Sequence, residues 1–277
     1  MFTLNCKGKL ISTKTALVMG IINATPDSFY EGDLQKGING ILAIATKMIN
    51  DGADILDIGG QSTKPNSERI SVEEEMKRVL PVIEIIHKHF PTTIISVDTY
   101  QSEVAKTAVE AGASIVNDIS AGELDTKMIP TVASMRNIPY ICMHTRGTPN
   151  TMQQLTNYDD VTKEILEYFI AKIDECKNAG IIDCIIDPGF GFAKTIAQNF
   201  TILKNLSILK MLNKPILLGV SRKSTIYKTL GITAANALNG TTVLNTLALQ
   251  NGANIIRVHD VKEAKEVVKL MYEYYLI

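Results

Sequence analysis

Four polar side chains that could take part in chemistry each lie two positions after an isoleucine, at the end of a short apolar run. They are Asp57, Asn117, Asp187 and Arg257. Residues two apart on a β-strand share one face, so each isoleucine and its polar partner would point the same way. Burying charged or amide groups is costly unless they meet one another or a ligand. The pattern predicts four strands that present polar groups at one height inside the fold.

A set of hydrogen-bond acceptors is formed by Asp98, Asn117 and Asp187, each at the end of an expected strand. An ionised carboxylate can accept two parallel hydrogen bonds from an amidine-like edge, which suits a heterocycle with several N–H donors. The alternative is a buried network that is satisfied by internal hydrogen bonds alone. The residue types leave both interpretations open.

Basic groups follow the last two expected strands, in residues 221–224 (Ser-Arg-Lys-Ser) and 257–260 (Arg-Val-His-Asp). Strand alternation places Arg257 and His259 on one face. Two cations and an imidazole near a Ser/Thr-rich loop suit a phosphate or pyrophosphate. The alternative is that these cations balance the charge of the neighbouring carboxylates.

The elements that must position these groups alternate regularly between strand and helix. Apolar runs and helical periodicity predict a hairpin or strand at residues 2–12, then strands at 17–22, 54–58, 93–97, 114–117, 139–143, 185–187, 215–220 and 254–258. The same patterns predict helices at 41–49, 71–89, 101–111, 125–135, 159–178, 196–211, 235–250 and 260–274. This alternation is typical of a parallel sheet covered by helices.

A closed barrel is favoured over an open, doubly wound sheet. No Gly-x-Gly-x-x-Gly turn follows the first strand, which argues against a dinucleotide fold. Gly52, Gly112, Gly180 and Gly252 each end a helix before a strand that carries the isoleucine pattern, and these are alternate strands. In a closed barrel alternate strands supply one inward layer. The prediction is a single α/β domain over residues 1–277, a (β/α)8 TIM barrel with residues 1–14 as an N-terminal strand or hairpin, and a site at the C-terminal ends of its strands.

Composition excludes several function classes. The chain has 277 residues, 45% hydrophobic residues and a net charge of −1, which gives no electrostatic footprint for nucleic acid or an anionic membrane. No apolar run approaches the roughly 18 residues of a membrane span, and the N-terminus lacks a signal-peptide core. The four cysteines (Cys6, Cys142, Cys176, Cys184) are scattered without a Cys-x-x-Cys pair, so we expect buried or incidental thiols in a reducing cytosol and no zinc or redox role. We expect a cytoplasmic protein with small-molecule substrates.

The motifs resemble those of the dihydropteroate synthase family, in the same order along residues 16–265. The matching segments are 23–29 (Asn-Ala-Thr-Pro-Asp-Ser-Phe), 59–65 (Gly-Gly-Gln-Ser-Thr-Lys-Pro), 96–99 (Ser-Val-Asp-Thr), 117–118, 143–144, 187–192 (Asp-Pro-Gly-Phe-Gly-Phe), 221–224 and 257–260. The resemblance implies a (β/α)8 barrel, usually a homodimer, that joins 6-hydroxymethyl-7,8-dihydropterin pyrophosphate to p-aminobenzoate in folate synthesis. Pyrophosphate is released in this reaction, and Mg²⁺ is the implied cofactor.

The resemblance also implies a role for each matching residue. The implied catalytic residues are Asp27, Lys223, Arg257 and His259. The implied pterin-binding residues are Asp98, Asn117, Met143, Asp187, Lys223 and Arg257. Pyrophosphate would meet Asn23, Thr63, Lys64, Arg257 and His259, with Asn23 near the metal, and p-aminobenzoate would meet Thr63, Phe192, Lys223 and Ser224.

Three positions depart from the usual family pattern. Gln61 and Lys64 stand where Glu and Arg are more common, and Ala193 stands where Gly is usual. Lys64 replaces a planar, two-pronged donor with a point charge. The alternative functions are a pterin-dependent methyltransferase, which would not need the basic segments for a leaving group, and an inactive pterin-binding paralogue. Retention of Asp27, Lys223, Arg257 and His259 argues against the paralogue.

Overall fold

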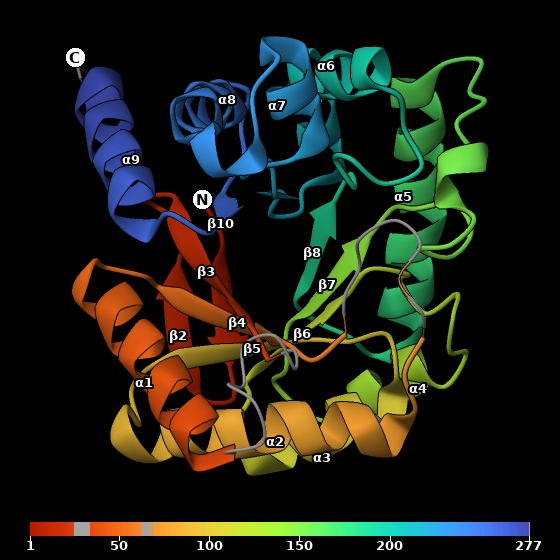
Figure 1. Ribbon diagram of the computed structural model, residues 1–277. Helices are drawn as coiled ribbons and strands as arrows, with labels where there is room; N and C mark the ends of the chain where they lie inside the picture. The colour runs from red at the N-terminus through yellow and green to blue at the C-terminus, as the bar shows by residue number, and fades with distance from the viewer. Residues whose placement is uncertain (25–33, 62–66, 68, 277) are drawn as a thin grey trace.

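The parallel strands form one eight-stranded sheet that closes on itself. A computed structural model describes residues 1–24, 34–61, 67 and 69–276. The strand order is β8-β7-β6-β5-β4-β3-β10-β9, and a parallel bridge between Ile186 and Ile216 joins the two ends. Figure 1 shows the strands around a common interior with the helices outside. The predicted (β/α)8 barrel is confirmed.

The barrel strands agree closely with the sequence prediction. They are β3 (Leu17–Asn23), β4 (Ile55–Gly59), β5 (Ile94–Asp98), β6 (Ile115–Asp118), β7 (Tyr140–Met143), β8 (Cys184–Asp187), β9 (Leu217–Leu218) and β10 (Ile255–Val258). Only β9 is much shorter than expected, since regular pairing covers two residues of the predicted 215–220.

The helices show larger differences. They are α1 (Leu34–Asn50), α2 (Val72–His89), α3 (Ser102–Ala111), α4 (Met128–Ser134), α5 (Val161–Ala179), α6 (Ile196–Lys204), α7 (Ser224–Leu230), α8 (Leu238–Gln250) and α9 (Val261–Leu276). The predicted helix 196–211 is divided into α6 and a 3₁₀ segment, Leu206–Leu212. Helix α7 was not predicted, because its seven residues, ended by Gly231, are too few to show a clear period.

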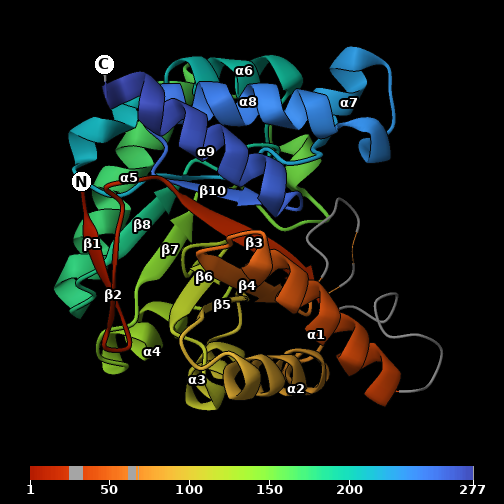
Figure 2. The same cartoon turned by 90° about the vertical axis from the view of Figure 1, so that its left-hand side faces the viewer.

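The predicted isoleucine layer lies inside the barrel. Ile55, Ile115, Ile185 and Ile255 are fully buried in one cluster that also holds Leu4 and Cys6. Leu4 and Cys6 belong to the antiparallel hairpin of β1 (Thr3–Cys6) and β2 (Lys9–Ser12). Figure 2 shows this hairpin beside the start of β3. The hairpin therefore covers the end of the barrel opposite the candidate site with apolar side chains.

Helix ends follow the predicted signals. Ser71 caps α2 by accepting a hydrogen bond from the amide of Glu74 at 3.2 Å. The four glycines expected to end helices all have positive φ, from 96° to 132°, which glycine adopts without the strain of a side chain. No helix in the described ranges is long and apolar enough to cross a membrane.

Candidate active site at the C-terminal ends of the strands

The three predicted acceptors lie together at the C-terminal ends of neighbouring strands. Asp98 is the last residue of β5, and Asn117 is the last but one of β6. The two residues lie opposite each other in the pairing of these strands. Asp187 ends β8, opposite Met143 of β7. All three side chains are buried, with Asp98 8% exposed. They form the floor of the barrel mouth, because each side chain points inward two residues after a buried layer.

Arg257 connects this floor to a neighbouring carboxylate, Asp57. Its Nε donates to Asp57 Oδ2 at 2.6 Å, and a terminal guanidinium nitrogen donates to Asp98 Oδ2 at 2.7 Å. Asn117 Nδ2 donates to the same Asp57 oxygen at 3.0 Å. Asp57 is fully buried, and its other oxygen has no hydrogen-bond partner among the described residues. For Arg257 the charge-balance interpretation is supported, since its guanidinium pairs with two carboxylates. Binding of an anion by the same group stays a prediction.

Burial shifts the protonation of the floor. It raises the pKa of Asp98 to about 7, against the opposing charge of Arg257 and with a further rise from Asp57. Burial also raises the pKa of Asp187, and the nearest opposing influence is Lys223. Both carboxyl groups therefore hold a proton more readily than an exposed aspartate does.

Lys223 supplies the second cation of the mouth. Its ammonium donates to the backbone oxygen of Phe190 and lies 4.5 Å from the ring centre of Phe192. Burial lowers the pKa of Lys223 to about 8, while Asp187 acts in the opposite direction. The ammonium thus lies against an aromatic ring and within the electrostatic influence of the Asp187 carboxylate.

The neighbouring arginine, Arg222, joins two loops by hydrogen bonds. Arg222 binds both oxygens of Asp260, at 2.7 and 2.8 Å, and donates to the backbone oxygens of Ala234 and Ala235. Its backbone has a positive φ of 54°. Arg222 received no role in the sequence-based site, and in the structure it clamps the loop after β9 to the loop after β10.

His259 is tied to the same two loops. Ser221 Oγ lies 2.9 Å from His259 Nδ1 and accepts from the backbone amide of His259 at 3.2 Å. Packing around the ring and, second, the charge of Arg257 lower the pKa of His259 below its usual value. The imidazole is nevertheless exposed at the rim. A bound anion would offset the positive field and favour the protonated ring.

An apolar wall stands beside the polar floor. Tyr100, Ile119 and Met143 are buried in one small cluster, with Phe192 packed against it. Met143 and Phe192 were both expected at a ligand site, and the structure brings them together. A flat ring that lies on this wall could direct its polar edge toward the floor.

The remaining predicted residues lie at the rim of the barrel mouth or outside the residues that the structure describes. Asn23 ends β3 with an exposed side chain, and Ser224 begins α7 directly after Lys223. The sequence-based roles of Asp27, Thr63 and Lys64 fall on residues outside the described ranges.

Two residues of this region received no role from the sequence. Asp57 carried the same Ile-x-polar signal as its three counterparts, and only the contact with Arg257 reveals its function as a buried counter-charge. Lys194 ends the Pro/Gly-rich segment after β8, and its side chain is 4% exposed among backbone oxygens. A buried lysine cannot be recognised from sequence, because lysine is usually exposed.

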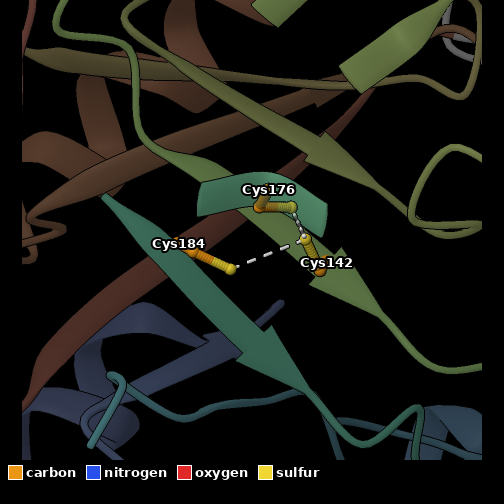
Figure 3. Close-up of side chains that lie close together, drawn as sticks. All are labelled: Cys142, Cys176 and Cys184. Carbon is orange, nitrogen blue, oxygen red and sulfur yellow. Dashed lines mark hydrogen bonds between the residues drawn. The ribbon is translucent and has the colours of Figure 1, made fainter. Parts of the chain in front are cut away.

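Three of the cysteines that are scattered in the sequence meet in the fold. Cys142 Sγ lies 3.7 Å from both Cys176 Sγ and Cys184 Sγ, between β7, α5 and β8 (Figure 3). All three thiols are buried in the main hydrophobic cluster, outside the barrel mouth. They pack as small apolar groups with weak S–H donors. Within the described parts of the chain this is the one cluster of side chains whose donor atoms could hold a metal ion.

Comparisons with known proteins agree with this geometry. The family model described as "Pterin binding enzyme" matches residues 19–259. The dihydropteroate synthase of Escherichia coli K12 is 42% identical over 256 residues, which is 92% of this chain and 90% of that protein.

Two solved structures of Xanthomonas albilineans dihydropteroate synthase are also similar. One contains 4-aminobenzoic acid, has a TM-score of 0.92 at 36% identity, and is matched over 99% of this chain and 98% of that one. The other is a complex with 7,8-dihydropteroate, has a TM-score of 0.89 at 34% identity, and is matched over the full length of both chains. This chain belongs to the pterin-binding enzymes and, among them, to the dihydropteroate synthase family.

Proposed function

We propose that this protein joins the 6-methylene carbon of 6-hydroxymethyl-7,8-dihydropterin pyrophosphate to the amine of p-aminobenzoate and releases pyrophosphate. The observation that carries this proposal is the meeting of Asp98, Asn117, Asp187, Lys223 and Arg257 at one end of a closed barrel. The reaction matches the name of its relatives, and one similar structure contains 7,8-dihydropteroate.

The pterin ring would lie against Met143 with its N–H edge toward Asp98, Asn117 and Asp187. A buried site of this kind discriminates well, because a ligand that lacks the N–H donors would leave buried acceptors unpaired. Arg257 is held at two points by Asp57 and Asp98, which fixes the plane of its guanidinium. We assign to that plane the role of covering the ring.

Pyrophosphate, the leaving group, and p-aminobenzoate, the second substrate, would lie on the side of Lys223 that faces away from the pterin. Arg257 and His259 would stabilise the charge that develops on pyrophosphate, together with Asn23, while Phe192, Lys223 and Ser224 border p-aminobenzoate. The amine of p-aminobenzoate is a weak nucleophile, because its lone pair is delocalised into the ring. Departure of pyrophosphate before attack is therefore the favoured order, since the pterin can delocalise the resulting cation.

Pterin binding is expected to depend on pH through Asp98. Since burial raises the pKa of Asp98 to about 7, the ionised form that accepts N–H bonds becomes dominant only above that pH. Affinity for 6-hydroxymethyl-7,8-dihydropterin, which lacks the pyrophosphate, should increase about tenfold from pH 6 to pH 8 and then level off. Calorimetry at several pH values measures this change. The Asp98→Asn variant should bind weakly and lose the increase between pH 6 and pH 8 that Asp98 causes, and a flat profile in the unmodified protein would contradict the assignment.

Magnesium is expected to bind only with the pyrophosphate substrate. At the mouth, Asn23 offers a neutral amide oxygen, and the described residues there include no cluster of carboxylates or histidines that could hold an ion. Mg²⁺ prefers substrate phosphates and retained waters, and when bound it would neutralise charge on the leaving group. Calorimetry should show no measurable Mg²⁺ binding to the free protein and clear binding once pterin pyrophosphate is present. Turnover that survives exhaustive chelation would contradict this.

The proposed reaction is tested by measuring pyrophosphate release. Protein, pterin pyrophosphate and Mg²⁺ are mixed with and without p-aminobenzoate, and 7,8-dihydropteroate is detected by chromatography. Release that requires p-aminobenzoate supports the proposal. Pterin binding without any release would identify an inactive paralogue, and methyl transfer from a methylated pterin would identify a methyltransferase.

We also propose that the protein forms a homodimer through α6, α7 and α8. These helices lie side by side in both views (Figures 1 and 2). Their region exposes apolar side chains, including Phe200, Leu230, Ile232, Val243 and Leu247. Several exposed apolar side chains on neighbouring helices are typical of an interface. Light scattering measures the mass in solution, and Val243→Glu should convert a dimer into a monomer.

A further inference from the structure

The ammonium of Lys194 is surrounded by hydrogen-bond acceptors. It donates to the backbone oxygens of Phe192 at 2.9 Å, Gly189 at 3.0 Å and His144 at 3.3 Å, and it lies 3.1 Å from His144 Nδ1. An ammonium has three N–H donors, so four acceptors exhaust them. No donor is left for a substrate, and Lys194 is therefore not itself a catalytic residue.

These contacts join two segments that form different parts of the barrel mouth. His144 directly follows β7, whereas residues 188–194 form the loop after β8. The approach is close, because a Cβ on Gly189 would lie 1.9 Å from the backbone oxygen of His144. Three backbone oxygens that converge on one point repel one another unless a cation lies between them. The Lys194 ammonium supplies that charge, and hydrogen bonds from an ionised donor are the stronger kind.

Burial works against the charged form of Lys194. It lowers the pKa of Lys194 to about 7, although Asp187 acts against that decrease, so the ammonium that holds the loop is lost as the pH rises above neutral. Burial and the charge of Lys194 lower the pKa of His144 to about 2, so its ring is neutral and Nδ1 can accept. The edge of Tyr168 packs against the same imidazole at a ring-centre distance of 4.8 Å, which fixes its orientation.

The loop that Lys194 holds carries two contacts of the mouth. The backbone oxygen of Phe190 accepts from Lys223, and the ring of Phe192 lies against the same ammonium. Asp187 Oδ1 accepts from the amide of Gly189 at 2.8 Å, so the loop also orients a floor carboxylate. Ala193 is held at a φ of 48°, a strained conformation for a residue with a side chain that persists only when its surroundings impose it.

We propose that Lys194 is a positioning residue, which fixes residues 189–192 so that Phe192 and Lys223 form the p-aminobenzoate side of the mouth. The inference rests on the proposed function for the identity of that substrate. The ordering of the loop by the ammonium does not depend on it. Loss of the ammonium should therefore affect the loop and the second substrate more than the pterin.

The test combines Lys194→Ala with chemical rescue. Hydrogen exchange of residues 189–194, measured without substrates, should become at least about tenfold faster in Lys194→Ala, and the KM for p-aminobenzoate should rise about tenfold. The KM for the pterin substrate should change much less. Propylammonium can fill the space left by the side chain and should restore both properties, whereas tetramethylammonium has no N–H donors and should restore neither. Lys177→Ala, at the exposed end of α5 and outside the proposed dimer helices, is the matched control and should behave like the unmodified protein.

The outcomes separate this inference from the proposed function. An inactive unmodified protein would overturn the proposed function, and the exchange measurement would still decide whether Lys194 orders the loop. Unchanged exchange in Lys194→Ala, or faster exchange with an unchanged KM for p-aminobenzoate, would overturn the positioning role. If both Lys194→Ala and Lys194→Met fail to fold by circular dichroism, Lys194 stabilises the barrel as a whole, and the positioning role is likewise overturned.

Discussion

Replacement of Arg257 by methionine should lower the free energy of unfolding by about 3–5 kcal/mol and abolish measurable synthase activity. The guanidinium binds Asp57 and Asp98 at 2.6 and 2.7 Å, and Asp57 is fully buried. Removing one partner of a buried ion pair leaves an uncompensated charge, which costs about this much. Urea unfolding followed by circular dichroism measures the change.

A second variant separates stability from activity in this prediction. In Asp57→Asn/Arg257→Met the fully buried charge is removed with its partner, and the new amide can still accept from Asn117. The double variant should recover part of the lost stability and stay inactive, because the cation at the mouth is still missing. A loss below about 1 kcal/mol in Arg257→Met would show that the two carboxylates do not depend on this arginine.

Replacement of Lys223 by methionine should lower kcat/KM for both substrates by roughly 10²–10³-fold. The free energy of unfolding should change little. The ammonium is the largest opposing influence on the raised pKa of Asp187, so its loss favours the neutral acid there. A protonated Asp187 accepts N–H bonds poorly, and the p-aminobenzoate side also loses its cation. The expected decrease is in the range for removal of one electrostatic stabiliser at a reacting centre.

Steady-state kinetics and pterin calorimetry test this prediction. Lys177→Met, at the exposed end of α5 and outside the proposed dimer helices, is the matched control and should retain full activity. If Lys223→Met loses activity for p-aminobenzoate alone, with pterin affinity unchanged, the coupling of Lys223 to Asp187 is wrong. Lys223 would then serve only the second substrate.

Much of the architecture could be predicted from sequence because strands and helices repeat with different periods. Ile-x-Asp, Ile-x-Asn and Ile-x-Arg on alternate strands predicted both closure of the barrel and the inward polar layer, and both are present. Side-chain alternation in a strand is a local property, so it does not depend on how distant parts of the chain fold. Helix α7 and the two-residue pairing of β9 escaped prediction because short segments carry too few periods.

The composition of the floor was likewise visible in the sequence, since Asp98, Asn117 and Asp187 end their strands. The residues that pair with these side chains could not be predicted from the sequence. The strand pattern marked Arg257 as inward-facing, but nothing in the residue order shows that Arg257 pairs with Asp57 and Asp98 or that Arg222 pairs with Asp260. Each pairing joins residues from distant segments, and it depends on the direction of single side chains after the barrel has closed.

The sequence by itself determined the barrel, the end at which polar groups gather and the family to which the chain belongs. Only the tertiary structure decided that Asp57 is a buried counter-charge, that Lys194 holds the loop after β8, and that three distant cysteines touch. The physical reason is the range of the interactions. Backbone periodicity acts over a few residues, whereas burial, charge compensation and pKa shifts depend on atoms that only folding brings within a few ångströms.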